Sequence, residues 1–192
     1  MPEKGLRGAM GPVITIAILL TLFGIVIFNF YYQTREYSSG LITKDLGFLQ
    51  TIFKQIDDKC KIVSFDQTKN SINFLNVGCF EGFEVGPIRL AYPQQWQGPY
   101  VEKNPSLQGI EYQVVRTKKG YFIVPGDGVI LPNGKIMGKN IKIDEQSDIE
   151  KMMEDDNALM HKNRPLGAKL KLSFSEWQKV LLQQMPDGPM LE

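Results

Sequence analysis

Residues 13–32, VITIAILLTLFGIVIFNFYY, form one apolar run without a charged side chain near the start of the chain. A helix of about 20 apolar residues crosses a bilayer core of about 30 Å, so the run predicts one membrane-spanning helix. Its aromatic end, Asn29-Phe30-Tyr31-Tyr32, is typical of the membrane interface. A cleaved secretory signal fits less well, because such a signal has a shorter apolar core and a small-residue cleavage motif.

The helical pattern continues beyond the apolar run. A polar stretch, residues 33–40, is followed by apolar residues whose spacing alternates between four and three. These spacings place the side chains on one face of a helix. The apolar residues of this face are Ile42, Leu46, Leu49, Phe53 and Ile56. We therefore expect one helix from about residue 12 to residue 59, embedded in lipid at its start and packed on a folded domain at its end.

The charges that flank the run indicate its orientation. Lys4 and Arg7 precede it without an acidic residue between Arg7 and the run, whereas Arg35 beyond it is followed directly by Glu36. Basic residues favour the cytoplasmic side, so we expect a cytoplasmic N-terminus and a domain outside the cytoplasmic membrane.

Two cysteines, Cys60 and Cys79, follow the membrane segment. Disulfides persist outside the cytoplasm, so we expect a Cys60–Cys79 bridge there. It would close a loop of about 20 residues and contribute about 3 kcal/mol in the loop-entropy model. The alternative is a pair of buried free thiols.

Composition limits what the rest of the chain can be. The 192 residues carry a formal charge of +1, which gives no indication of the clustered basic face that nucleic-acid binding needs. Removing about 40 residues for the membrane segment leaves roughly 150, the size of one modest domain. Glycine and proline crowd between residues 78 and 139, which favours turn-rich β structure.

Short β-type segments follow the predicted helix. The strongest signal is a hairpin, in which residues 110–116 and 121–124 flank the turn Lys118-Lys119-Gly120. We expect residues 89–92 to be a strand or a loop. The remaining expected strands of this small antiparallel meander are residues 61–65, 71–77, 129–131 and 136–137.

The last part of the chain has a different character. Residues 148–161 predict a short acidic helix with Asp148 or Ser147 as its N-cap. Residues 175–184 predict a last amphipathic helix, and residues 186–192 a loose tail.

The sequence therefore predicts an α+β fold. A long N-terminal transmembrane helix continues into a helix that packs on a small antiparallel β-sheet, with short C-terminal helices. The expected divisions are a basic leader or cytoplasmic flank (1–8), the transmembrane helix (9–32), its amphipathic continuation (33–59), a β-rich extracytoplasmic domain (60–143) and a C-terminal helical extension and tail (144–192).

Several weak motifs occur along the chain in an informative order. A short basic leader ends in Gly8, and the apolar run follows at once. Further on come Gly98-Pro99-Tyr100-Val101, Asn104-Pro105, Ile110-Glu111-Tyr112 and Gly126-Asp127-Gly128. With the long helix, this order resembles type IV pilins and type II secretion pseudopilins over about residues 5–143.

The resemblance implies a pilin-like fold and a non-enzymatic structural subunit of a bacterial type IV pilus or type II secretion filament. It implies cleavage by a prepilin peptidase between Gly8 and Ala9. The protein would sit in the bacterial inner membrane with its C-terminal domain in the periplasm or outside the cell. Its partners would be membrane lipid, copies of itself or other pilin-like subunits, and an inner-membrane assembly platform.

The chain also departs from the family pattern. Counted from Ala9, the fifth position is Val13, where most pilins have a glutamate that neutralises a neighbour's terminal amine. Tip-type minor pseudopilins also lack this glutamate. The alternative is an uncleaved, single-pass signal-anchored subunit of another envelope complex.

The resemblance also points to a calcium site, formed by Asp127, Asn133 and Asp144, as in the C-terminal loop of major pseudopilins. Calcium takes six to eight oxygen ligands. Turns use Asp and Asn in any case, because these side chains cap local backbone groups, and we otherwise expect no cofactor.

The remaining polar and aromatic groups favour ordinary structural roles. His161 is the only histidine, which argues against a zinc site or a catalytic triad. The acidic cluster Glu150, Glu154, Asp155 and Asp156 is typical of a solvated face, with a basic partner or a metal as the alternative. Trp96, Tyr100 and Tyr112 either pack in the core or line a ligand groove. We therefore expect that this chain is not an enzyme.

Overall fold

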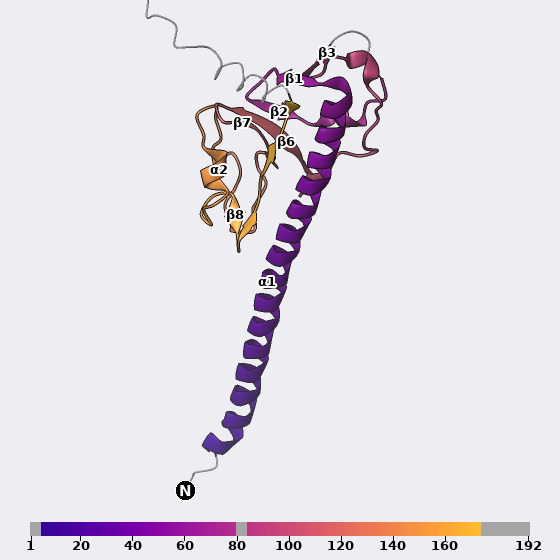
Figure 1. The fold of residues 1–192 in the computed structure, drawn as a ribbon. Coiled ribbons are helices and arrows are strands. Elements are labelled where there is room, and N and C mark those ends of the chain that lie inside the picture. Colours follow the sequence, from indigo (N-terminus) through magenta and orange to yellow (C-terminus); the bar gives the residue numbers. More distant parts are fainter. Residues whose placement is uncertain (1–4, 80–83, 174–192) are drawn as a thin grey trace, which may run out of the picture. The chain divides into compact units, whose positions relative to one another are not determined.

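The computed structural model describes residues 5–79 and 84–173 (Figure 1). Helix α1, Gly5–Cys60, is one continuous α-helix of 56 residues. The predicted continuity of the helix is confirmed, although the helix begins at Gly5 rather than near residue 12. By its internal contacts the chain divides into two units, Met1–Ser38 and Ser39–Glu192, so α1 belongs to both.

The amphipathic half of α1 buries the face that the sequence predicts. Side chains of this face, spaced by four and three residues, are at most 4% exposed and belong to the hydrophobic core of the second unit. They are Ile42, Leu46, Leu49, Phe53 and Ile56. The core of the second unit is therefore formed by this face of the helix on one side and by strand residues on the other.

Three small antiparallel sheets make up the β structure of the described residues. The largest has five strands in the order β10-β7-β6-β2, with β5 also paired to β6. Its strands are β2 (Lys69–Ser71), β5 (Ser106–Leu107), β6 (Ile110–Thr117), β7 (Gly120–Pro125) and β10 (Ala168–Leu170). The smaller sheets contain β1 (Ile62–Phe65), β4 (Ile88–Leu90) and β3 (Glu84–Val85), and β8 (Met160–His161) with β9 (Arg164–Pro165).

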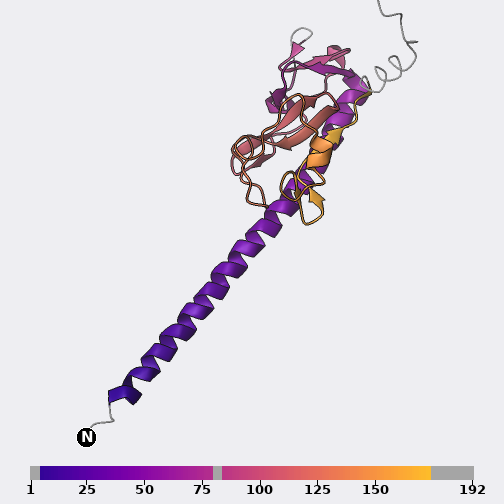
Figure 2. The same cartoon turned by 90° about the vertical axis from the view of Figure 1, so that its left-hand side faces the viewer.

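The strands of the second unit lie beside the C-terminal part of α1 in both views (Figures 1 and 2). Phe53 of α1 packs against Phe65 of β1, with ring centroids 6.1 Å apart, and against Phe74 at 6.0 Å. The structure is thus α+β, with a long N-terminal apolar helix and small antiparallel sheets.

The predicted hairpin is confirmed as β6 and β7, which pair from Tyr112↔Pro125 to Thr117↔Gly120. Gly120 has a φ of 120°, a conformation that favours glycine, so the turn residue suits its position. The expected strands at 129–131 and 136–137 are reduced to an isolated bridge between Ile130 and Ile136.

The strand expected over residues 71–77 is wrong in most of its length. β2 ends at Ser71, and residues Asn73–Asn76 form a 3-10 helix, η1. The reason is visible in the burial of Phe74 and Leu75, which are adjacent and both in the core. A strand would place these two side chains on opposite faces, whereas a helical turn buries both. A second 3-10 helix, η2, spans Pro93–Gln95.

The acidic helix expected over 148–161 is also shorter than predicted. Helix α2 spans only Ile149–Met152, with Asp148 as its N-cap accepting a hydrogen bond from Lys151 N at 3.4 Å. Acidic residues oppose the dipole at a helix C-terminus, and Asp155 instead forms a turn by accepting from Asn157 N at 2.8 Å.

The region expected as a helical extension contributes to the main sheet. β10 pairs with β7, so the largest sheet reaches past residue 143 into the C-terminal part of the chain. The amphipathic helix expected over 175–184 and the tail expected over 186–192 lie outside the described residues.

Candidate functional site

The apolar segment of α1 exposes its large side chains from Val13 to Phe30. The large apolar residues from Val13 to Phe30 are between 52% and 73% exposed. A core helix of a water-soluble domain buries its apolar face, whereas this segment leaves its apolar side chains exposed. The helix is long and apolar enough to cross a membrane, and it is the only such helix among the described residues.

Hydroxyl side chains in and just after this segment donate hydrogen bonds to backbone carbonyl oxygens of the same helix. Thr21 Oγ1 donates to Ala17 O at 2.8 Å, and Thr34 Oγ1 donates to Phe30 O at 2.8 Å. Ser38 Oγ donates to Thr34 O at 2.9 Å. A hydroxyl that bonds to the preceding turn presents no unpaired donor to lipid, which suits a membrane segment.

The proposed processing point lies inside α1. The helix begins at Gly5, so Gly8 and Ala9 are within its first two turns, and the exposure of these two residues lies outside what the structure describes. Cleavage between them stays a prediction from the resemblance.

The expected disulfide is absent from this structure. Cys60 and Cys79 are both free, and they lie in different environments, since Cys60 is buried at the end of α1 and Cys79 is exposed. Burial raises the pKa of the Cys60 thiol, against the lowering influence of Lys59 and of a hydrogen bond with Tyr100. The expected Cys60–Cys79 bridge is therefore not formed in this structure.

The acidic residues expected at the calcium site are engaged in separate local contacts. Asp127 Oδ2 forms an ion pair with Lys69 Nζ at 2.6 Å. Asp144 Oδ1 accepts from Ser147 Oγ at 2.8 Å and from Gln146 N at 3.0 Å. These hydrogen bonds lower the pKa of Asp144 and fit a turn-capping role.

Asn133 orders a loop through its side-chain amide. Its Nδ2 donates to three backbone carbonyl oxygens of residues 156–160 at 2.8–3.2 Å, and its Oδ1 accepts from Lys135 N at 3.1 Å. Within the described residues, no group of three or more His, Cys, Asp or Glu side chains is arranged to hold a metal ion. A calcium site formed by Asp127, Asn133 and Asp144 stays a prediction, because each of these side chains is engaged in its own local contacts.

The aromatic candidates pack in the second unit. Trp96 and Tyr100 form an edge-to-face pair with centroids 4.8 Å apart, and Trp96 Nε1 donates to Val77 O at 3.1 Å. Tyr112 is buried, and its hydroxyl donates to Asp45 Oδ2 of α1 at 3.1 Å. Burial and the neighbouring Asp45 raise the pKa of Tyr112, and burial raises the pKa of Asp45.

The acidic cluster is divided in two by the structure. Glu150 forms an ion pair with Lys169 Nζ at 2.7 Å, whereas Glu154, Asp155 and Asp156 are exposed in the turn after α2. His161 lies on β8, and its Nε2 is buried without a hydrogen-bond partner among the described residues.

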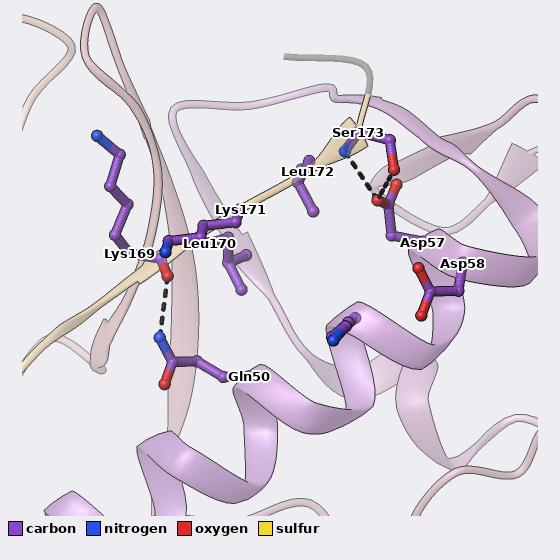
Figure 3. Close-up of a pocket in the computed structure, with 9 residues that line it drawn as sticks. Gln50, Asp57, Asp58, Lys169, Leu170, Lys171, Leu172 and Ser173 are labelled. Carbon is purple, nitrogen blue, oxygen red and sulfur yellow. Dashed lines mark hydrogen bonds between the residues drawn. The ribbon is translucent and has the colours of Figure 1, made fainter. Parts of the chain in front are cut away.

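A groove of about 380 Å³ lies between α1 and the segment 169–173 (Figure 3). Asp57 lies at one end of the groove, where it links α1 to Ser173. Its Oδ2 accepts from Ser173 N at 2.8 Å and from Ser173 Oγ at 2.6 Å, and its Oδ1 accepts from Ile62 N at 2.9 Å. The groove is otherwise lined by Gln50, Lys54, Asp58, Lys169, Leu170, Lys171 and Leu172.

Sequence reasoning missed Asp57, although a signal was available. Carboxylates near the C-terminus of a helix oppose its dipole, so Asp57 and Asp58 close to the end of α1 require a compensating partner. Asp57 is 3% exposed and finds three donors, one of which belongs to a residue 116 positions away.

No protein-family model, curated protein or solved structure matches this chain.

Proposed function

We propose that this chain is a membrane-anchored, pilin-like or pseudopilin-like structural subunit of a bacterial type IV pilus or type II secretion filament. The observation that carries the proposal is the continuity of α1 from an exposed apolar segment into the amphipathic half that forms part of the domain core. A plain membrane anchor needs no such continuity, because a flexible linker would tether a domain equally well.

The physical role of such a helix follows from its two halves. The apolar half dissolves in lipid before assembly, and its open face then packs on equivalent helices of neighbouring subunits. Gly24 is suited to close packing, because a residue without a side chain lets two helix backbones approach each other. The amphipathic half holds the domain to the helix through the buried face from Ile42 to Ile56.

The proposed setting is the bacterial inner membrane, crossed once, with the N-terminus in the cytoplasm and the domain in the periplasm or outside the cell. The partners are membrane lipid, copies of the chain or sister pilin-like subunits, and an inner-membrane assembly platform. Val13 at the fifth position from Ala9 favours a minor or tip subunit over a major one. A buried terminal amine would otherwise lack its usual carboxylate.

Mass spectrometry of the chain purified from membranes tests the processing step. In cells with an active prepilin peptidase we expect an N-terminus at Ala9. The variant Gly8→Val should keep the full leader, and the matched variant Gly5→Val should still be cleaved. An intact N-terminus in the wild type would refute processing.

An uncleaved signal-anchored subunit is the second candidate. It is favoured by the position of Gly8 and Ala9 inside α1, because a peptidase reads an extended bond more easily than a helical one. Mechanical shearing of cells separates the two functions. A filament subunit appears in the sheared material, whereas a fixed membrane subunit stays with the cells.

A further inference from the structure

Asn29 carries the one side-chain amide in the apolar run of α1. The other polar side chains of residues 13–32 are two threonines and two tyrosines. Thr21 Oγ1 donates to Ala17 O at 2.8 Å, so this hydroxyl uses its proton within its own helix. The Asn29 amide has two donor hydrogens and an acceptor oxygen, and among the described residues it makes no hydrogen bond. In an apolar environment this amide therefore needs a partner from outside the helix.

Asn29 lies just inside the aromatic end of the run. Phe30, Tyr31 and Tyr32 follow it and are typical of the membrane interface. Asn29 precedes Tyr32 by three residues, which is about 5 Å along the helix. Polar groups at this depth stabilise the association of membrane helices when they pair with one another. The described residues contain no second helix that could cross a membrane, so a protein partner must come from another chain.

Asn29 shares one side of the membrane segment with Leu22, Val26 and Gln33. Successive members of this set are four, three and four residues apart, which places them along one face of a helix. All four are exposed, with Leu22 at 53% and Val26 at 64%. Gln33 makes no hydrogen bond within the described part of the chain either. We call these four residues the amide face, because it joins an apolar surface to two amides one turn apart.

A second copy of the chain offers the groups that these amides need. Where two identical helices pack about a two-fold axis, each residue near the axis faces its own counterpart. An amide suits that position because it both donates and accepts, and a single asparagine between helices can fix their register and number. Like charges would repel there, and residues 22–33 contain no charged side chain. The chemistry of the amide face is therefore self-complementary.

We propose that two copies of the chain pair in the membrane through the amide face. The two segments are parallel, Leu22 and Val26 pack on their counterparts, and the Asn29 amides hydrogen-bond to each other. Gln33 makes the same contact one turn further along. The pair leaves the side of the helix that carries Gly24 open for packing in a filament. This inference deepens the proposed function and rests on its membrane anchoring, because all copies then cross the bilayer in one orientation.

Energy transfer between copies in lipid vesicles tests the role of Asn29. Full-length chains carry donor and acceptor dyes on the exposed Cys79, and transfer is measured as the protein is diluted into lipid. We expect Asn29→Leu, which removes the amide and keeps the size, to weaken association about 3- to 30-fold. Asn29→Gln, which keeps an amide, should lose less than about threefold. Association that is unchanged in Asn29→Leu would assign the amide to lipid headgroups and overturn the proposal, as would a wild type that does not associate.

Thr21→Val is the matched control for loss of a polar group. The Thr21 hydroxyl lies in the same segment and is bonded to Ala17 O of its own helix. Its removal should change association by less than about twofold, because no contact between copies is lost. Equal losses in Thr21→Val and Asn29→Leu would mean that polarity of the segment matters and the contact between amides does not, which would overturn the proposal.

Cysteine cross-linking tests which side of the helix pairs. Single cysteines are placed in a full-length chain whose two native cysteines are replaced by alanine, and the vesicles are oxidised with copper phenanthroline. We expect Leu22→Cys and Val26→Cys to form linked dimers, since each meets its counterpart. Leu20→Cys and Phe28→Cys are the controls, because these positions are 66% and 69% exposed and point away from the amide face. Dimers that are no more abundant on the amide face than at the controls would overturn the proposal.

Shearing keeps this inference separable from the proposed function. Copies that pair through the amide face but never appear in sheared material would retain the pair and exclude the filament. Sheared filaments of a wild type whose copies do not pair in vesicles would retain the filament and exclude the pair.

Discussion

Asp57 is the residue on which the end of α1 depends most. Its carboxylate accepts from Ile62 N, Ser173 N and Ser173 Oγ, and it is 3% exposed. Removing it leaves buried donors without an acceptor. We predict that Asp57→Ala lowers the free energy of unfolding by about 2–3 kcal/mol, measured by urea unfolding in detergent.

Asp58 provides the control, because it is the neighbouring carboxylate and it is exposed. Asp58→Ala should change the free energy of unfolding by less than about 0.5 kcal/mol. Equal losses in the two variants would mean that charge near the helix end matters and the three hydrogen bonds do not.

Asp45 makes stability depend on pH. Burial raises the pKa of Asp45, although the Tyr112 hydroxyl and Lys44 lower it. The folded state then holds the proton more tightly than the unfolded state, so stability falls as pH rises from about 3.9 through the raised pKa. We predict that Asp45→Asn gains stability relative to the wild type as pH rises from acid to neutral, in unfolding curves measured across that range. A gain that is the same at every pH would contradict this origin.

The two thiols should differ strongly in reactivity. Cys79 is exposed, whereas Cys60 is buried and burial raises its pKa, so little thiolate is available there. We predict that a polyethylene-glycol maleimide labels the native chain once, at Cys79, and that Cys60 reacts about tenfold more slowly or only after unfolding. Two labels that appear only after reduction would instead indicate a disulfide.

At the scale of elements, the amphipathic half of α1 distinguishes neighbouring residues. Leu49 is fully buried and Phe48 is 50% exposed. We predict that Leu49→Ala lowers the free energy of unfolding by about 2–5 kcal/mol, because it leaves a cavity against the sheet. Phe48→Ala should cost less than about 0.5 kcal/mol under the same denaturant series. Similar losses would place both side chains in the core.

The elements that local pattern predicts well are those with a strong period. The face from Ile42 to Ile56 repeats as a helix, and the β6–β7 hairpin alternates around Lys118-Lys119-Gly120. Where adjacent residues are both buried, as at Phe74 and Leu75, the period alone misleads. The helix expected over residues 148–161 is also too long, because the acidic residues after α2 form a turn.

The groove could not be predicted from the sequence, because it is made by long-range contacts. Gln50 meets Lys169 across 119 positions, and Asp57 meets Ser173 across 116. No local period encodes those pairs. The expected disulfide fails for a similar reason, since two cysteines in sequence do not reveal that one is buried in the core and the other exposed.

At the scale of the whole molecule, one helix performs two separable tasks. Leu49 belongs to the half that stabilises the domain, and the large apolar residues from Val13 to Phe30 belong to the half that is exposed. A substitution in one half should therefore leave the other task intact. Leu49→Ala should lower domain stability without releasing the chain from membranes, and the membrane variants below should do the reverse.

Leu22 and Phe23 lie at the centre of the apolar run and are 53% and 65% exposed. An arginine at the centre of a membrane helix costs about 2.5–3.5 kcal/mol on insertion scales, so two cost about 5–7 kcal/mol. We predict that Leu22→Arg with Phe23→Arg moves the full-length chain from the membrane pellet to the supernatant in alkaline carbonate extraction. Tyr37→Arg, which is beyond the run and 74% exposed, should leave the chain in the pellet. Retention of the double variant in the pellet would mean that another part of the chain holds it to the membrane.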